Sequence, residues 1–154
     1  GRAMRVPVEG TVSRGALQED DALHLGKVDE AWITYVPGGI DADLMARGRE
    51  RYQVFCAACH GATGSGDGMV SRRAANLAEG TWVTPSDLTA AVTLDRPEGE
   101  LFDFISHGIR KMPAYDAQIP IADRWAIVGY VRALQRRAHG QLADVPDNLR
   151  AEIK

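Results

Sequence analysis

Apolar residues recur at helical spacing in three stretches of this 154-residue chain. The first runs from Asp41 to Phe55, where Asp41 is suited to cap the amino end of a helix. The second spans residues 98–107 and ends at Gly108, a typical C-cap. The third covers about residues 122–137. No stretch alternates apolar and polar residues as a strand would, so the sequence predicts an all-α fold.

The first and last predicted helices each carry a face suited to close packing. The apolar face of the first includes Gly48, which has no side chain and lets another backbone approach. We expect it to cross the last helix at Gly129 and Tyr130. Residues 61–91 between the helices read mostly as loop, with a turn at residues 85–88 leading into a short helix. The last helix presents Trp125, Ile127, Val128, Tyr130, Val131 and Leu134.

The chain divides into an N-terminal extension at residues 1–40, a helical domain at residues 41–139 and a tail at residues 140–154. The extension contains many glycines and prolines and no sustained period, which is typical of a segment without its own core. It nevertheless carries apolar residues such as Trp32 and Ile33. Two interpretations stay open: an arm wrapped over its own domain, or a docking arm along a partner subunit.

Charge excludes one class of partner. The net charge is −3, and residues 41–139 hold twelve basic and twelve acidic side chains. With charges balanced in this way, the domain has no strongly basic surface that would bind nucleic acid. It also lacks a ring of lysines of the kind that steers a freely diffusing carrier to its partner.

No apolar run approaches 20 residues, so the sequence predicts no transmembrane segment.

The residues with the clearest chemistry are Cys56-Ala57-Ala58-Cys59-His60. Two thiols about one helical turn apart can form thioethers to the vinyl groups of a haem, and the adjacent His60 can then ligate the iron. These are the only two cysteines in the chain, so one covalent haem c uses both. A thioredoxin-like pair would normally follow a strand, and a zinc site would need two further ligands at suitable spacing.

Met112 is the predicted sixth ligand, because a thioether closes the distal side of the iron in an electron carrier. Pro113 disfavours helix at Met112 and holds it in an extended loop. Met69, in a glycine-rich loop soon after His60, is the rival. Met45 reads as a core residue, and Met4 lies in the extension.

His107 is the alternative that would make the iron bis-histidine. It lies in the last turn of the predicted helix at residues 98–107, where histidine commonly interacts with the helix dipole. His24 and His139 read as surface residues.

In this order, the haem motif, the Gly48 and Tyr52 pair, Met112-Pro113 and the Trp125–Leu134 helix resemble class I cytochrome c over residues 41–139. The resemblance implies a small helical fold around one haem c with His60 and Met112 as axial ligands. It also implies a helix interface built from Gly48, Tyr52, Ile127 and Tyr130. In that family a proline carbonyl orients the proximal histidine, which here implies Pro85.

A narrower resemblance lies in residues 5–15, Arg-Val-Pro-Val-Glu-Gly-Thr-Val-Ser-Arg-Gly. This segment is similar to the one before the haem domain in the monohaem cytochrome c subunit of bacterial alternative complex III, often called ActE. That complex is a membrane quinol oxidoreductase with iron–sulfur clusters and several haems c. The resemblance implies an electron-transfer subunit that passes electrons towards a terminal oxidase or a soluble carrier.

The expected function is therefore electron transfer rather than bond-making catalysis. We expect a peripheral protein on the periplasmic side of the bacterial cytoplasmic membrane, with an export segment removed from its N-terminus. Its partners would be other subunits of a membrane complex and redox proteins such as a multihaem cytochrome. A freestanding periplasmic carrier is the main alternative, and a haem enzyme or gas sensor with an open distal site is the other.

Overall fold

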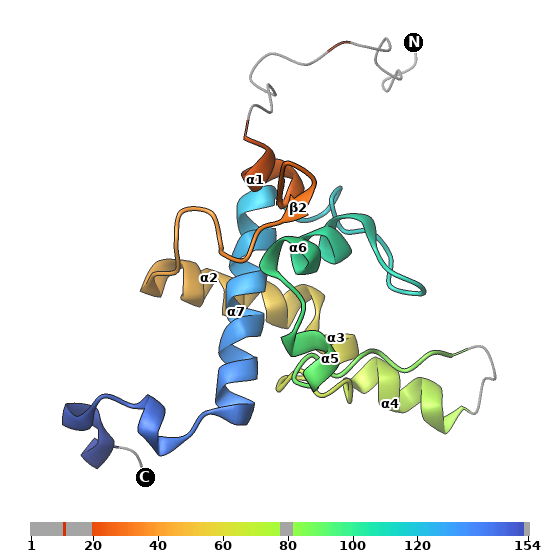
Figure 1. Ribbon diagram of the computed structural model, residues 1–154. Helices are drawn as coiled ribbons and strands as arrows, with labels where there is room; N and C mark the ends of the chain where they lie inside the picture. Colours follow the sequence, from red (N-terminus) through yellow and green to blue (C-terminus); the bar gives the residue numbers. More distant parts are fainter. Residues whose placement is uncertain (1–10, 12–19, 78–81, 153–154) are drawn as a thin grey trace, which may run out of the picture.

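The computed structural model describes residue 11 and residues 20–77 and 82–152 of the chain. Helices dominate this part (Figure 1). The one pair of strands in it is a hairpin of β1 and β2, each two residues long. The elements are α1 (Asp21–Leu25), β1 (Lys27–Val28), β2 (Ala31–Trp32), α2 (Ala42–Phe55), α3 (Ala57–His60), α4 (Met69–Asn76), α5 (Ala91–Leu94), α6 (Glu98–His107), α7 (Ile121–His139) and the 3₁₀ helices η1 (Leu142–Asp144) and η2 (Asp147–Glu152).

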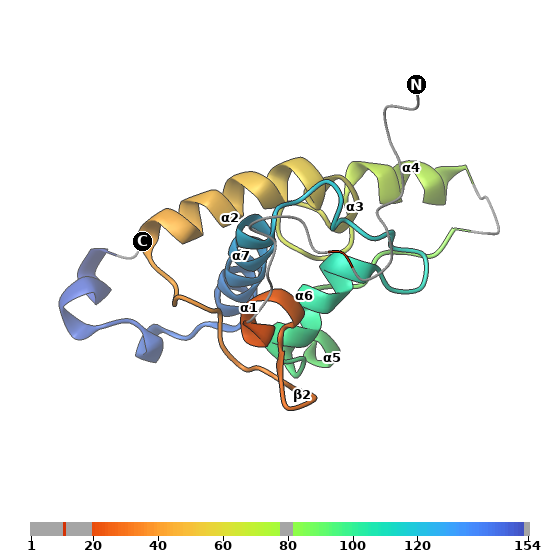
Figure 2. The same ribbon diagram turned by 90° about the horizontal axis from the view of Figure 1, so that it is seen from above.

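Helices α2 and α7 cross each other (Figures 1 and 2). The contact lies at Gly48, as the sequence predicted. A Cβ atom on Gly48 would lie 2.0 Å from the backbone oxygen of Ala126 and 3.0 Å from Cβ of Tyr130. Gly129 lies beside this contact and faces the side chain of Leu44. The rings of Tyr52 and Tyr130 pack 5.4 Å apart. The missing side chain of Gly48 therefore lets the two backbones touch.

An ion pair reinforces the crossing. Arg47 of α2 donates from Nε and Nη2 to the two carboxylate oxygens of Asp123 on α7, at 2.7 and 2.8 Å. Asp123 is buried, whereas Arg47 is half exposed. The bidentate geometry fixes the rotation of one helix relative to the other as well as their distance.

The core lies where α6 packs on α7. The rings of Phe102 and Trp125 stack at 4.3 Å, and the indole nitrogen of Trp125 donates to the backbone oxygen of Leu23 at 2.8 Å. Burying these aromatic rings supplies much of the apolar area removed from water. The buried apolar residues are Ile33, Val36, Tyr52, Leu101, Phe102, Ile105, Ile119, Trp125, Ala126, Ile127, Val128, Val131 and Leu134.

The described part of the N-terminal extension lies against its own domain. Ile33 and Val36 are only 5% exposed and belong to the core. The Ile33 backbone donates to Gly26 and accepts from Gly99 of α6, both at 3.0 Å. Residues 20–36 therefore form part of this fold. Met4 and the segment at residues 5–15, apart from Thr11, lie outside the described residues.

We expect Gly99→Val to release residues 20–36 from α6. A Cβ atom at position 99 would lie 1.9 Å from the backbone oxygen of Gly26 and 3.0 Å from the backbone nitrogen of Ile33. Because both neighbours are backbone atoms, they cannot move aside as a side chain tip would. Hydrogen exchange should become faster in residues 20–36, with Thr34→Ala at an exposed position as the control. Unchanged protection of Ile33 would contradict the expectation.

Helix α4 was not predicted, because residues 61–91 read mostly as loop. Its first turn begins after Gly68, and a Cβ atom there would lie 2.3 Å from the backbone oxygen of Ala58 in α3. Ser71 of α4 is buried. The helix is therefore stabilised by contact with α3, a tertiary effect that a short amphipathic sequence does not reveal.

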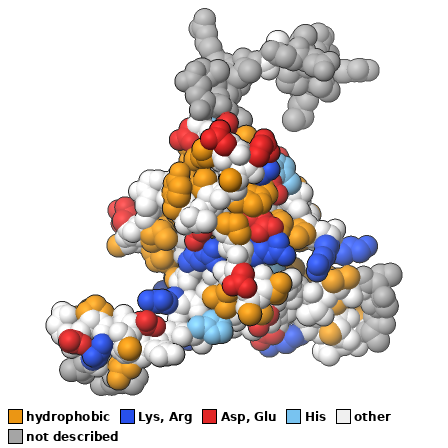
Figure 3. Space-filling model, viewed as in Figure 1, with side chains coloured by type: hydrophobic (Ala, Val, Ile, Leu, Met, Phe, Trp, Pro, Cys, Tyr) orange, Lys and Arg blue, Asp and Glu red, His pale blue; other side chains and the backbone are white. Residues whose placement is uncertain are grey.

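Charges on the molecular surface are mixed. On the face in Figure 3, acidic side chains stand out near α1, and basic side chains cross the middle with acidic ones among them. This face therefore carries no large field of one sign. Within residues 20–77 and 82–152, no helix has the length and apolar character needed to cross a bilayer.

Candidate functional site

The haem motif occupies the break between α2 and α3. Cys56 ends α2 with φ −110° and ψ −40°, and α3 starts at the next residue. The backbone nitrogen of His60 donates to the Cys56 oxygen at 2.8 Å, so the motif forms one tight turn. Both cysteines are free thiols and partly buried. Burial, with a smaller effect of Cys59, raises the pKa of the Cys56 thiol to about 12.

The imidazole of His60 has one nitrogen occupied and one free. Its Nδ1 lies 3.1 Å from the backbone oxygen of Ser86. Because a carbonyl only accepts, Nδ1 carries the proton and Nε2 keeps its lone pair for a metal ion. Burial lowers the pKa of His60, and the hydrogen bond to Ser86 opposes this only in part. The ring is therefore suited to remain neutral and ready to ligate.

The carbonyl that orients His60 belongs to Ser86 and not to Pro85, which corrects the role that the resemblance implied for Pro85. The Pro85 carbonyl lies against Gly66, where an added Cβ atom would be 2.5 Å from its oxygen. The Pro85 oxygen therefore lies beside Gly66, whereas the next carbonyl, that of Ser86, lies at the imidazole.

The loop that carries Ser86 is fixed by hydrogen bonds close to it. Leu88 donates its backbone N–H to the oxygen of Gly64 at 2.7 Å. The carboxylate of Asp87 accepts from the nitrogen and hydroxyl of Thr89, both at 2.7 Å. These bonds from Thr89 lower the pKa of Asp87. The loop is therefore bound both to the segment after His60 and to itself.

Tyr52 supports the other side of the motif. Its hydroxyl donates to the backbone oxygen of Gly61, directly after His60, at 2.8 Å. Tyr52 is 1% exposed, and burial raises its pKa well above the usual value. Helix α2 therefore anchors both ends of the motif. Its chain continues directly into Cys56, and the buried hydroxyl of Tyr52 binds Gly61, the residue after His60.

Met112 lies on a tight turn after α6. Ile109 and Met112 exchange two backbone hydrogen bonds at 3.1 and 2.9 Å, and Arg110 adopts φ +55°. Met112 is partly buried against the core, and Pro113 after it is exposed. The next aromatic residue, Tyr115, contacts Phe55 edge-on at 6.4 Å.

Tyr115 brings this loop to the haem motif. Burial raises the pKa of Tyr115, and the nearby thiols of Cys59 and Cys56 raise it further. Because Tyr115 contacts Phe55, the residue directly before Cys56, the Met112 loop borders the haem motif.

The other methionines occupy different places. Met69 is 70% exposed at the start of α4. Met45 is partly buried in α2, and Met4 lies outside the described residues.

The remaining histidines have partners or positions of their own. His107 donates from Nδ1 to Asp103 at 2.7 Å, within its own helix. His139 donates from Nε2 to the oxygen of Thr89 at 2.6 Å. His24 differs from the surface position that we expected, because it is only partly exposed and its buried Nδ1 has no hydrogen-bond partner among the residues that the structure describes.

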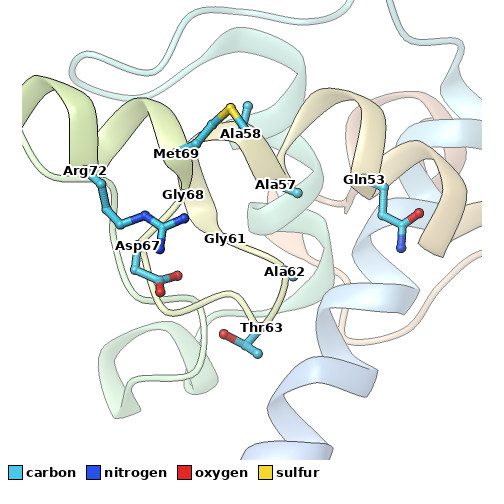
Figure 4. Close-up of a pocket in the computed structure, with 10 residues that line it drawn as sticks. All are labelled: Gln53, Ala57, Ala58, Gly61, Ala62, Thr63, Asp67, Gly68, Met69 and Arg72. Carbon is cyan, nitrogen blue, oxygen red and sulfur yellow. The ribbon is translucent and has the colours of Figure 1, made fainter.

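A surface hollow of about 450 Å³ lies beside α3. Small residues form most of its lining, while Arg72 and Asp67 extend side chains along it and Met69 lies next to Ala58 (Figure 4). Because most of the lining side chains are small, this side of α3 is open to solvent. The lining residues are Gln53, Ala57, Ala58, Gly61, Ala62, Thr63, Asp67, Gly68, Met69 and Arg72.

These features fit a single haem c. Cys56 and Cys59 can bind it covalently, and the free Nε2 of His60 is the type of donor that iron requires. Across residues 20–77 and 82–152, no group of three or more His, Cys, Asp or Glu side chains could hold a separate metal ion. Sequence reasoning missed Ser86, because a backbone carbonyl leaves no signal in residue type.

Comparison with known proteins supports the same assignment. The family model described as "Cytochrome C oxidase, cbb3-type, subunit III" matches residues 43–131, more than half of the chain. No curated protein shows significant similarity.

A chain of the Kuenenia stuttgartiensis reducing HAO-like protein complex Kustc0457/Kustc0458 has a similar fold, with a TM-score of 0.51 and 20% identity. The match covers 74% of this chain and 54% of that one, so the chain spans about half the length of that structure. At this identity the likeness concerns the fold alone. The family match shows that the chain belongs to the c-type cytochromes described as cbb3-type cytochrome c oxidase subunit III, and that residues 43–131 form a cytochrome c domain, a type of domain that transfers electrons.

Proposed function

We propose that this chain is the monohaem electron-transfer subunit of a membrane-associated quinol-oxidising complex of the alternative complex III type. It would pass electrons towards a terminal oxidase or a soluble carrier from the periplasmic side of the membrane. The electron-transfer part of the proposal rests on the geometry of His60. Its Nδ1 is hydrogen-bonded to the backbone oxygen of Ser86, which leaves Nε2 for iron.

In this proposal His60 and Met112 would hold the haem iron. A haem c held in this way would supply one-electron chemistry between the ferric and ferrous states of its iron. The protein's contribution is to hold the two ligands and to exclude water from them. Tyr52 and the Ser86 loop position His60, and the turn at Ile109–Met112 presents the thioether. Met69 is a poor rival because its side chain is largely in solvent.

Membership of the complex rests on sequence. Residues 5–15 resemble the segment before the haem domain of the alternative complex III subunit. The balanced charge of residues 41–139 favours a fixed interface over electrostatic steering of a diffusing partner. The family description names an oxidase subunit, so a terminal oxidase is the second candidate partner.

Native isolation from membranes tests this proposal. We expect the chain to co-purify with iron–sulfur and multihaem subunits and to show a low-spin haem c spectrum with histidine and methionine ligands. Co-purification with copper- and haem-containing oxidase subunits would favour the second candidate. A solitary protein in the soluble fraction would contradict both and favour a freestanding carrier.

We expect Met112→Ala to open the distal side of the iron. Loss of the thioether removes the ligand that favours ferrous iron, so the reduction potential should fall and the protein should bind carbon monoxide when reduced. Visible spectra with and without carbon monoxide provide the measurement. Met69→Ala is the matched control and should leave the spectrum unchanged. An unaltered spectrum in Met112→Ala would show that another residue is the sixth ligand.

A further inference from the structure

Gln135 of α7 is a buried amide that reaches the loop of Ser86. It is 3% exposed, and its Nε2 donates to the backbone oxygen of Leu88 at 2.8 Å. Leu88 lies two residues after Ser86, whose carbonyl accepts from His60. Only one side chain and two residues of backbone therefore separate α7 from the hydrogen bond of the proximal histidine.

The orientation of this amide is determined by Arg132, one turn earlier on α7. Arg132 donates to Oε1 of Gln135 at 2.8 Å, and because arginine only donates, the oxygen must face it. Arg132 is in turn held by Glu98 at 2.8 Å and by the backbone oxygen of Leu94 at 3.2 Å. The amide nitrogen of Gln135 is thus left to face Leu88.

A second donor from α7 binds the same loop one residue later. His139 donates from Nε2 to the backbone oxygen of Thr89 at 2.6 Å. Gln135 and His139 lie four residues apart and therefore share one face of the helix. Together they bind two successive carbonyls of the loop, while Leu88 binds Gly64 through its N–H. The loop is pinned from α7 and from the haem-binding segment at once.

We propose that Gln135 and His139 are positioning residues that set the reduction potential by holding the Ser86 carbonyl on Nδ1 of His60. A strong hydrogen bond from Nδ1 makes the imidazole a better electron donor and stabilises ferric iron. Loosening the loop weakens that bond and favours ferrous iron. The inference rests on the proposed function in one respect, that His60 ligates the haem iron.

The first test is Gln135→Met in the haem-loaded protein. Methionine is close in length but has no N–H donor, so the Leu88 carbonyl loses its partner. At a fixed ambient potential we expect the ratio of ferrous to ferric protein to rise about threefold, equal to about 28 mV for one electron at 59 mV per tenfold change. In nuclear magnetic resonance spectra of the ferrous protein, the Nδ1–H proton of His60 should move upfield and exchange faster.

A matched control separates positioning from stability. Val131→Ala creates a small cavity in the same helix, at a residue that is 6% exposed and belongs to the core. It should lower the free energy of unfolding without moving the potential or the His60 signal. His139→Leu, at an exposed position where folding is not at risk, should shift the potential upward by less than Gln135→Met does.

The outcomes are distinguishable from failure of the proposed function. If the wild-type protein shows no imidazole ligation, the proposed function fails before any variant is compared. If the wild type shows it, but Gln135→Met keeps both the potential and the His60 signal, the positioning role is wrong. If Gln135→Met does not fold, His139→Leu decides: an unchanged potential overturns the role, and an upward shift supports it.

Discussion

Gly48→Ala is expected to lower the free energy of unfolding by more than about 3 kcal/mol, or to prevent folding altogether. The added Cβ atom would lie 2.0 Å from the backbone oxygen of Ala126 and 2.7 Å from its carbon. A contact this short forces α2 and α7 apart along the crossing where Arg47 and Asp123 also meet.

The opposing effect is smaller. Alanine favours helix over glycine by about 1 kcal/mol, so an open position in α2 would be stabilised by the same change. At Gly48 the neighbouring atoms are backbone of a buried helix and cannot rotate away. The steric cost therefore exceeds the gain in helix propensity.

Gly129→Ala provides the matched control at the same crossing. Its Cβ atom would lie 3.0 Å from the side-chain tip of Leu44, which can change rotamer, and at an ordinary contact distance of 3.8 Å from the side chain of Ile40. We expect Gly129→Ala to be near neutral, within about 1 kcal/mol of the wild type. Denaturant unfolding of the oxidised protein, followed by circular dichroism, measures both. Equal stabilities of the two variants would contradict the crossing geometry.

Replacing both thiols, in Cys56→Ala/Cys59→Ala, is expected to abolish covalent haem attachment. No other cysteine exists in the chain to form a thioether. Any haem then depends on coordination bonds alone, and acid breaks the bond to His60 by protonating its imidazole. Extraction with acidified organic solvent should remove all of the haem from the double variant and none from the wild type.

The single variants sharpen this expectation. Each should retain one thioether and keep its haem through extraction, with a visible band shifted to longer wavelength because one vinyl group stays conjugated. Ala57→Ser, inside the motif but without sulfur chemistry, is the control and should match the wild type. Haem that resists extraction from the double variant would show attachment elsewhere in the chain.

Much of the helical framework follows from local signals. Asp41 caps α2 through a hydrogen bond to the nitrogen of Leu44 at 2.7 Å, as its position before an apolar period predicted. Gly108 ends α6 with φ +80°, a backbone conformation that glycine adopts without strain. These boundaries depend on residues within one or two turns, so the chain order alone reveals them.

Other features depend on residues that are distant in sequence. Helix α4 exists because Gly68 packs on Ala58, and residues 20–36 join the core because Gly26 and Gly99 allow backbone contact. In both cases a glycine with no helical or strand signal of its own marks the contact. Residue type predicts that a close approach is allowed there but not which segment makes it.

The sequence by itself determined the haem-binding pattern of Cys56, Cys59 and His60, because covalent chemistry and ligation require those residue types at that spacing. It also determined the three main helices, since periodicity and capping are local. Only the tertiary structure decided that Ser86, rather than Pro85, accepts from His60 and that Gln135 reaches the loop beside it. The physical reason is that a backbone carbonyl is identical at every residue, so its direction is set by folding and not by side-chain identity.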